Sequence, residues 1–300
     1  MTDLRGRVVL VTGAGSGIGA AGAAELLRRG ANPVLMDIDP AGLDATRAAL
    51  GDRVLAVLGD VCDASACESA VAAALDRHSR LDVVWANAGI AAFGPLAHTD
   101  PGAWARCLEV NVNGVFNTVR AALPAVLKAR GQVVVTASAA SFSHAPLMSA
   151  YAASKAAVEA MCNAWRLELA AHGVSVSAIH AHWVSTPLVA EGALHPAFTR
   201  LRATMPAFMN RELSPAAAAV LIVDGIAHRR RRIWVPGWVR WLHAMRALLH
   251  SPLGERELQR AAPDMEAAYL TGLAEAGALA SSLAPREHAR AVARGMARED

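Results

Sequence analysis

Tyrosine and lysine are scarce in this chain of 300 residues, which contains two of each. Its positive charge comes almost wholly from arginine, since only two of the 29 basic residues are lysines. One tyrosine and one lysine nevertheless stand four positions apart in "YAASK", residues 151–155. Positions i and i+4 share one face of a helix, so Tyr151 and Lys155 are predicted to project side by side. Taken alone, the pattern is compatible with an ordinary amphipathic helix or with a catalytic pair.

Cysteine and long apolar runs are also in short supply. The chain has four cysteines, Cys62, Cys67, Cys107 and Cys162, without CxxC spacing, which argues against a disulfide framework or a metal site and favours reduced thiols. No apolar run reaches the length of about 18 residues that crosses a bilayer. The N-terminus "MTDLRGRVVLVTG" lacks the charged leader, apolar core and cleavage site of a signal peptide. These absences predict a cytoplasmic location.

Composition indicates a globular protein, because 54% of the residues are hydrophobic and 18% are charged. The formal net charge of +3 is unevenly distributed, since residues 228–260 hold eight arginines against two glutamates. This short cluster lacks a recognisable nucleic-acid-binding module, so we expect no nucleic-acid partner.

Apolar segments of strand length alternate with alanine- and leucine-rich segments of helical length. The expected strands lie within 8–13, 32–37, 53–60, 81–89, 131–138, 174–181 and 231–237. The expected helices include 20–29, 64–78, 101–129, 151–172 and 215–227. Apolar strands joined by helices predict an α/β fold with a doubly wound parallel sheet, the Rossmann-like architecture. We expect residues 1–236 to form one dinucleotide-binding and catalytic domain, and residues 237–300 to form a helical C-terminal extension.

The first expected strand runs into the glycine-rich turn "TGAGSGIG", which places Gly13, Gly17 and Gly19 at the start of a helix. A backbone without Cβ atoms can approach a diphosphate closely, and the helix N-terminus offers free N–H groups. Asp37 ends the second strand, about twenty residues further on, where a carboxylate accepts hydrogen bonds from an adenosine ribose. Position 38 is Ile38, with no cation for an extra phosphate, so the sequence favours NAD over NADP.

Several further motifs follow in a fixed order. They are "GDV" at 59–61, "NAG" at 87–89, "VNVNG" at 110–114, Ser138, and "YAASK" with its tyrosine thirteen residues after that serine. With the glycine-rich turn, this series resembles the short-chain dehydrogenase/reductase family, in its single-domain branch, over residues 5 to about 236. The resemblance favours the catalytic interpretation of Tyr151 and Lys155.

The resemblance implies a set of cofactor-binding residues. The turn would hold the diphosphate, Asp60 and Val61 would contact adenine, the "NAG" residues would line the cofactor, and two residues after the sixth strand would hold the nicotinamide carboxamide. The implied residues are Gly13, Ser16, Gly17, Ile18, Gly19, Asp37, Asp60, Val61, Asn87, Gly89, Tyr151, Lys155, Val184 and Thr186.

The resemblance also implies four catalytic roles. Tyr151 would be the general acid/base for an alcohol oxidised by NAD, and Lys155 would lower its pKa and hold the nicotinamide ribose. An adjacent ammonium and the nicotinium charge can lower a phenol pKa of about 10 by one to three units. Ser138 would orient the substrate oxygen, and Asn111 would hold a water in the proton relay.

The chain departs from the family after the sixth strand. Where the family usually has Pro-Gly, "HAHWVSTPL" has Ala181 and His182. His182 stands near the substrate or nicotinamide face, where it either relays protons, binds a polar substrate group or fills space. Residues 187–213 occupy the place of a substrate lid and are largely apolar, which predicts a hydrophobic secondary alcohol or ketone as substrate. The expected substrate-pocket residues are Phe93, Phe142, His144, Met148, His182 and Trp183.

The extension begins with "GWVRWLHAMRALLH", an amphipathic segment. One predicted helix face carries Trp238, Trp241, Leu242, Met245 and Leu249, and the other carries Arg240, His243, Arg246 and His250. We expect the apolar face to be buried over the substrate cleft or in a homodimer or homotetramer; contact with a membrane surface is the less favoured alternative. Two other functions remain open: a non-catalytic nucleotide-binding regulator and, third, a sugar-nucleotide epimerase or dehydratase.

Overall fold

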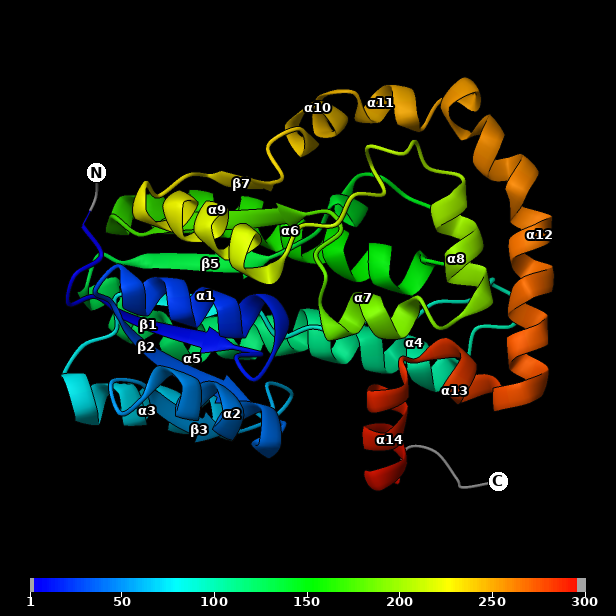
Figure 1. The fold of residues 1–300 in the computed structure, drawn as a ribbon. Coiled ribbons are helices and arrows are strands. Elements are labelled where there is room, and N and C mark those ends of the chain that lie inside the picture. Colours follow the sequence, from blue (N-terminus) through cyan, green and yellow to red (C-terminus); the bar gives the residue numbers. More distant parts are fainter. Residues whose placement is uncertain (1–2, 296–300) are drawn as a thin grey trace.

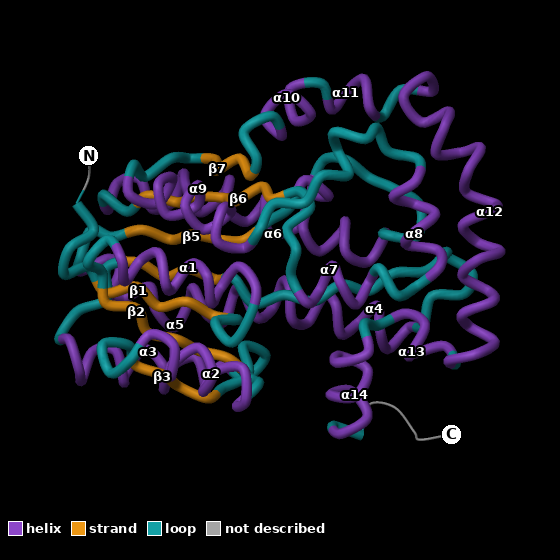
Figure 2. Tube along the Cα trace, viewed as in Figure 1, coloured by secondary structure: helices purple, strands orange, loops and turns teal. Residues whose placement is uncertain are grey.

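The computed structural model describes residues 3–295 and contains one parallel sheet of seven strands in the order β3-β2-β1-β4-β5-β6-β7 (Figures 1 and 2). The strands are β1 Val8–Thr12, β2 Asn32–Asp37, β3 Leu55–Leu58, β4 Val83–Ala86, β5 Gln132–Thr136, β6 Ser175–Ala181 and β7 Arg232–Val235. The order reverses between β1 and β4, so a crevice opens at the carboxyl ends of these strands. The Rossmann-like fold predicted from the sequence is confirmed.

Helices cover both faces of the sheet and continue beyond it. The α-helices within the first 236 residues are α1 Gly17–Arg28, α2 Pro40–Leu50, α3 Ala64–His78, α4 Pro101–Leu108, α5 Gly114–Lys128, α6 Ser149–Leu169, α7 Pro187–Gly192, α8 Pro196–Ala203 and α9 Pro215–Ala227. The short helical turns are η1 Glu109–Asn113, η2 Ala139–Ser141 and η3 Ala170–His172. The later helices are α10 Val239–Ala244, α11 Arg246–Leu249, α12 Pro252–Ala276, α13 Ala278–Ser282 and α14 Pro285–Ala293.

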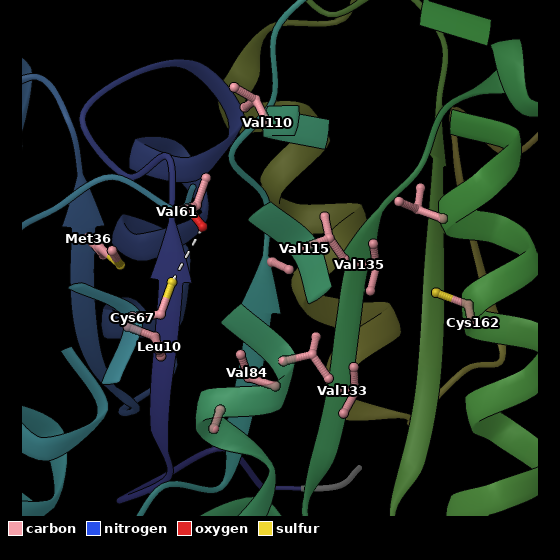
Figure 3. Packing of buried hydrophobic residues seen from close by; sticks show 14 of the residues in the cluster. Leu10, Met36, Val61, Cys67, Val84, Val110, Val115, Val133, Val135 and Cys162 are labelled. Atoms are coloured by element: carbon pink, nitrogen blue, oxygen red, sulfur yellow. Dashed lines mark hydrogen bonds between the residues drawn. The ribbon is translucent and has the colours of Figure 1, made fainter. Parts of the chain in front are cut away.

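The core lies on both sides of the sheet, because its central strands are apolar on both faces. On one side, valines of β4 and β5 pack against α3, α5 and α6; Val115 of α5 lies beside Val133 and Val135 of β5 (Figure 3). On the other side, the strands pack against α1 and α9. Burial of this apolar surface is the main stabilising contribution and holds the carboxyl ends of the strands in register.

The expected helix over 101–129 is interrupted. Residues Glu109–Asn113 form a π-helical turn between α4 and α5. Such turns occur mostly as single insertions at functional sites, and this one contains Asn111.

Up to residue 295, the last that the structure describes, the C-terminal extension is helical and wraps around the open end of the sheet. Figure 1 shows α10 and α11 crossing above the carboxyl ends of the strands, α12 descending beside α8, and α14 standing below α7. Leu283 and Ala291 from its last part belong to the same core as the sheet. A single β-bridge also joins Leu283 to Ala92.

The amphipathic segment is only partly buried in the way the sequence predicted. The chain changes direction at Met245, which separates α10 from α11, so the expected continuous stripe does not form. Val239 and Leu242 are buried against Ala139 and Phe142. The prediction was wrong for two members of the stripe, because Trp241 and Met245 are exposed. On the opposite face, the His243 ring packs edge-on against Phe142, and the His250 ring lies near His144.

Among residues 3–295, no helix is both long and apolar enough to cross a membrane.

The contact between the extension and the body depends on Tyr269 of α12. Its ring is fully buried, and its hydroxyl lies 2.7 Å from Ser282 Oγ and donates to the His98 carbonyl at 3.2 Å. Tyr269→Phe removes this hydroxyl and leaves the buried Ser282 hydroxyl and the His98 carbonyl without their hydrogen-bond partner. We therefore expect the free energy of unfolding to fall by about 1–3 kcal/mol. Chemical denaturation measures it.

The control is Thr271→Val, because the Thr271 hydroxyl is exposed and bonds only within its own helix. An equal loss of stability in both variants would contradict the role assigned to the Tyr269 hydroxyl.

Candidate active site

A large cleft opens at the carboxyl ends of the strands, with a volume of about 480 Å³. One end is lined by Asp37, Asp39 and Asp60, and the other by the lid helices α7 and α8. Tyr151 and Lys155 line its middle. The fold therefore brings residues from nearly every expected motif to one continuous surface.

The glycine-rich turn forms the floor of the cleft. Gly13 has φ of +67° and Gly17 of +54°, conformations that side chains rarely allow. A Cβ on Gly19 would lie 2.1 Å from the Gly13 carbonyl oxygen, so only glycine fits there; Gly19 itself lies behind the wall. Ser16 precedes α1 without capping it through its side chain, and Ile18 lies beside it in the wall. The N–H groups at the start of α1 are thus available to an anion such as a diphosphate.

Asp37 closes the adenosine end of the cleft. Its carboxylate accepts hydrogen bonds from Gly15 N at 2.7 Å and Asp39 N at 2.9 Å. These bonds fix the carboxylate between the glycine-rich turn and the start of α2, where a ribose can reach it. Ile38 also lines the cleft, as an apolar residue where a 2′-phosphate would need a cation.

The residues of the "DV" and "NAG" motifs line the same cleft. Asp60 and Val61 line the cleft beside the adenosine end. The Asn87 side chain donates to the Thr12 carbonyl at 3.1 Å, which ties β4 to β1. A Cβ on Gly89 would lie 3.1 Å from Asn111 Oδ1 and 3.3 Å from Lys155 Nζ, so the missing side chain lets the backbone approach these two groups.

Val184 and Thr186 form the opposite wall. Val184 is buried and pairs with Leu213 in an isolated bridge. Thr186 precedes α7, and its hydroxyl accepts a weak hydrogen bond from Val189 N at 3.4 Å. A Cβ on Gly17 would lie 3.0 Å from the Thr186 methyl group, so this wall closely approaches the glycine-rich turn.

Tyr151 and Lys155 project from the first turns of α6 toward the same point. Lys155 Nζ lies 5.6 Å from the centre of the Tyr151 ring and donates to the Thr136 carbonyl at 2.9 Å. Burial lowers the pKa of Lys155 to about 8. Burial also raises the pKa of Tyr151 to about 12, although the Ser138 hydroxyl partly offsets this effect. The expected lowering of the phenol pKa is therefore not met by Lys155 alone, because desolvation of the phenolate dominates.

Ser138 follows β5 and stands beside the phenol in the cleft wall. Its hydroxyl accepts from Ala140 N at 3.1 Å and donates to the Ala181 carbonyl at 3.4 Å. The first bond caps the turn Ala139–Ser141 and holds the hydroxyl at the end of β5.

Asn111 is fully buried in the π-helical turn. Its Oδ1 accepts from Ile90 N at 2.8 Å, and its Nδ2 donates to the Ile90 carbonyl and to Ser154 Oγ, each at 2.9 Å. Both ends of the side chain are therefore engaged, and Asn111 does not line the cleft.

His182 and Trp183 line the cleft near the lid, as predicted. Burial lowers the pKa of His182 to about 4, so the imidazole is neutral near pH 7. Its ring packs against Trp183 and Trp238. Of the alternatives for His182, the structure thus favours packing or binding of a polar group over proton exchange near neutrality.

Two of the expected pocket residues do not reach the cleft. Phe93 packs against His195 and Phe198, behind the lid, and Phe142 packs against His243 and Trp234 beneath α10. Both predictions were wrong because neighbouring helices bury these rings on the side away from the cleft. His144 and Met148 both line the cleft, and their contact with a substrate stays a prediction.

Other cleft residues gave no signal in the sequence. Arg286, Glu287 and Arg290 of α14 line the cleft, although they follow the glycine-rich turn by more than 250 residues. Leu249 and Leu258 of the extension also line it, in agreement with the expectation that this segment covers the substrate cleft. A charged helix at the end of a chain indicates no particular contact, so only the tertiary structure could reveal these residues.

Comparison with known proteins agrees with this geometry. The family profile for short chain dehydrogenases matches residues 7–195. An uncharacterised NAD-dependent oxidoreductase of Mycobacterium tuberculosis is 34% identical over 71% of this chain and 84% of that protein. The (-)-trans-carveol dehydrogenase of Rhodococcus erythropolis is 34% identical over 63% of this chain and 75% of that protein.

A crystal structure of a short-chain dehydrogenase/reductase from Burkholderia phymatum in complex with NAD superposes with a TM-score of 0.72. It is 29% identical and covers 84% of this chain and 98% of its own. The chain therefore belongs to the short-chain dehydrogenase family. It is an oxidoreductase that acts on CH–OH groups and uses NAD as its cofactor.

The position of Asp37 predicts how cofactor preference can be changed. Replacement of Asp37 by Ser together with Ile38→Arg removes a carboxylate and adds a cation at the ribose. We expect the ratio of the NADPH dissociation constant to the NADH dissociation constant to fall by about tenfold or more. A tenfold change corresponds to about 1.4 kcal/mol, which one favourable charge contact supplies. Fluorescence titration with both cofactors measures this ratio.

Ile38→Arg alone is the control, because it adds the cation and keeps the carboxylate. A wild-type protein that binds NADPH more tightly than NADH would contradict the assignment of Asp37.

Proposed function

We propose that this enzyme interconverts a hydrophobic secondary alcohol and its ketone by hydride transfer with NAD(H). The observation that carries the proposal is the apolar character of the cleft around Tyr151. Its wall there includes Met148, Trp183, Phe198, Leu201, Met205, Met209, Leu249 and Leu258. Such a wall favours an apolar ligand held by few polar contacts. The similarity to a carveol dehydrogenase supports the same substrate class.

Tyr151 is the general acid/base of the proposed reaction. Oxidation of an alcohol removes a hydride from carbon, which bound NAD⁺ accepts, and a proton from oxygen, which needs a base. Tyr151 lines the cleft and adjoins the Ser138 hydroxyl, so the phenolate would take the proton while Ser138 orients the substrate oxygen. In the reverse direction the phenol returns the proton to the ketone oxygen.

Lys155 and Asn111 support this step. The Lys155 ammonium lies near the Tyr151 ring and stabilises the phenolate, and it would also bind the nicotinamide ribose. Asn111 would hold a relay water through its main chain, because its side chain is occupied by Ile90 and Ser154. The proton could then leave the buried phenol.

The high pKa of Tyr151 gives the cofactor a second role. Burial holds the phenol protonated near neutral pH. The positive charge of oxidised nicotinamide stabilises a nearby phenolate. We therefore expect ionisation of Tyr151 to require bound NAD⁺, so that the base becomes active only when a hydride acceptor is present.

We also propose that the enzyme is a homodimer or homotetramer that pairs through α5 and α6. Leu167 of α6 is 81% exposed and Phe116 of α5 is 48% exposed, and burial of both against a second copy would remove apolar surface from water.

Contact with a membrane surface is the less favoured alternative. It rests on Trp241 and Met245, which are exposed and lie near Arg240 in the sequence. The cytoplasmic location stays a prediction from the sequence.

A non-catalytic nucleotide-binding regulator is the alternative of another class. It needs the glycine-rich turn and Asp37 but no acid/base group, so turnover distinguishes it from the enzyme.

Tyr151→Phe removes the acid/base hydroxyl and leaves the glycine-rich turn and Asp37 intact. We expect kcat to fall by about 10²–10⁴, while the NADH dissociation constant changes little. NADH absorbance measures turnover, and fluorescence titration measures cofactor binding.

The control is Tyr269→Phe, which makes the same substitution at the only other tyrosine, a residue that does not line the cleft. It should retain kcat at temperatures where the variant is folded. Full activity of Tyr151→Phe would exclude the phenol as the acid/base group.

A homologous series of methyl ketones tests the apolar cleft. Each added CH₂ that becomes buried should raise kcat/KM about fourfold until the cleft is filled, the factor that corresponds to about 0.8 kcal/mol. The same ketones with a terminal carboxylate are the control, since they add a charge that the apolar wall cannot solvate. A preference for the carboxylates would exclude a hydrophobic substrate, and absence of turnover across a broad alcohol and ketone panel would favour the regulator.

A further inference from the structure

The C-terminal helix α14 contacts the adenosine end of the cleft. Arg294, just after the helix, pairs with Asp60, with 2.6 Å between Nη2 and Oδ2. Arg290 Nη2 lies 3.7 Å from Asp39 Oδ2, beside the segment that carries Asp37. Two charges of one helix thus bind two segments that follow β2 and β3.

The other end of α14 contacts the opposite wall. Arg286 Nε lies 3.1 Å from Oε1 of Glu191, and the Arg286 backbone N–H also points to this carboxylate at 3.5 Å. Glu191 belongs to α7, the lid helix that begins directly after Thr186. The helix therefore bridges the adenosine wall and the lid, which the sheet itself does not connect.

The position of α14 is fixed by buried contacts. Glu287 pairs with Arg106 of α4, with 3.0 Å between Oε1 and Nε, and both side chains are about 95% buried. Ala291 packs into the core below the sheet. Since breaking a buried ion pair leaves an uncompensated charge, this pair specifies one docked position for the helix.

The helix also supplies positive charge that the glycine-rich turn lacks. Among the described residues, four cationic side chains line the cleft: Lys155, Arg106, Arg286 and Arg290. Lys155 lies at the catalytic centre, and Arg106 is buried by its acidic partners. The two remaining arginines are part of α14 and are 61% and 33% exposed. They are thus the cations best placed to meet the negative charge of a dinucleotide in this cleft.

We propose that α14 is a strap that closes the cleft over NAD(H), with Arg286, Arg290 and Arg294 as determinants of cofactor retention. The cofactor leaves when the ion pairs to Glu191, Asp39 and Asp60 break and the strap moves away from one wall. NADH then dissociates more slowly than it would if only the glycine-rich turn and Asp37 held it.

Stopped-flow displacement of bound NADH by excess NAD⁺ measures release without any substrate, so the outcome is independent of the proposed alcohol and ketone chemistry. The double variant Arg290→Gln/Arg294→Gln removes both contacts to the adenosine wall. We expect the NADH release rate to rise about tenfold, since exposed ion pairs contribute about twofold to fivefold each. Both side chains are partly exposed, so the fold should remain intact, which thermal unfolding verifies.

The matched control is Arg28→Gln/Arg230→Gln, which removes the ion pairs that two exposed arginines make with Glu25 and Asp224, away from the cleft. A release rate in the strap variant that rises no more than in this control overturns the proposal.

A charge exchange tests the bridge to the lid separately. Glu191→Arg and Arg286→Glu each place like charges together and should accelerate NADH release. The combined variant restores an opposite pair, and we expect its release rate to return to within about twofold of the wild-type value, inside the range of one exposed ion pair. If the combined variant still releases NADH quickly, the strap proposal is overturned. That outcome would mean that Arg286 slows release only by direct contact with the cofactor, because the combined variant restores the ion pair but not the arginine at position 286.

Discussion

The buried ammonium of Lys155 is the interaction on which the active site depends. It lies 3% exposed inside the fold, and its hydrogen bond to the Thr136 carbonyl fixes the start of α6 against the end of β5. The missing side chain at Gly89 lets the backbone approach both Lys155 and Asn111. Through these contacts one charge joins α6 to the end of β5, which precedes Ser138, and lies close to the turn after β4.

The same burial explains how the site resists ionisation without its cofactor. Desolvation lowers the pKa of Lys155 to about 8 and raises the pKa of Tyr151 to about 12, so each shift disfavours the charged form. Burial in this site therefore disfavours the phenolate form of Tyr151. In the proposed function, the positive charge of oxidised NAD would compensate this effect and couple the acid/base group to occupancy of the cofactor site.

The lid and the extension convert an open sheet edge into an enclosed cleft. In a doubly wound sheet the crevice at the strand ends is open to water on its outer side. Here α8 and α12 pack around the apolar cluster of Leu201, Met265 and Tyr269, and α14 spans the outer side between the lid and the adenosine wall. The apolar closure thus lies beside the lid, and the charged closure runs from Glu191 of the lid to Asp60 at the other end of the cleft.

The sequence alone determined the sheet, the glycine-rich turn and the pairing of Tyr151 with Lys155. Strands apolar on both faces, glycines such as Gly19 that no other residue can replace, and the helical spacing of Tyr151 and Lys155 depend on local geometry, which a sequence pattern records directly. Only the tertiary structure decided the rest. Phe93 and Phe142 face away from the cleft because helices distant in the sequence bury them, and the extension segment breaks at Met245, which exposes Trp241. The contacts of Arg290 with Asp39 and of Arg294 with Asp60 join residues more than 200 positions apart. No local pattern encodes such contacts, because they depend on how the whole chain packs.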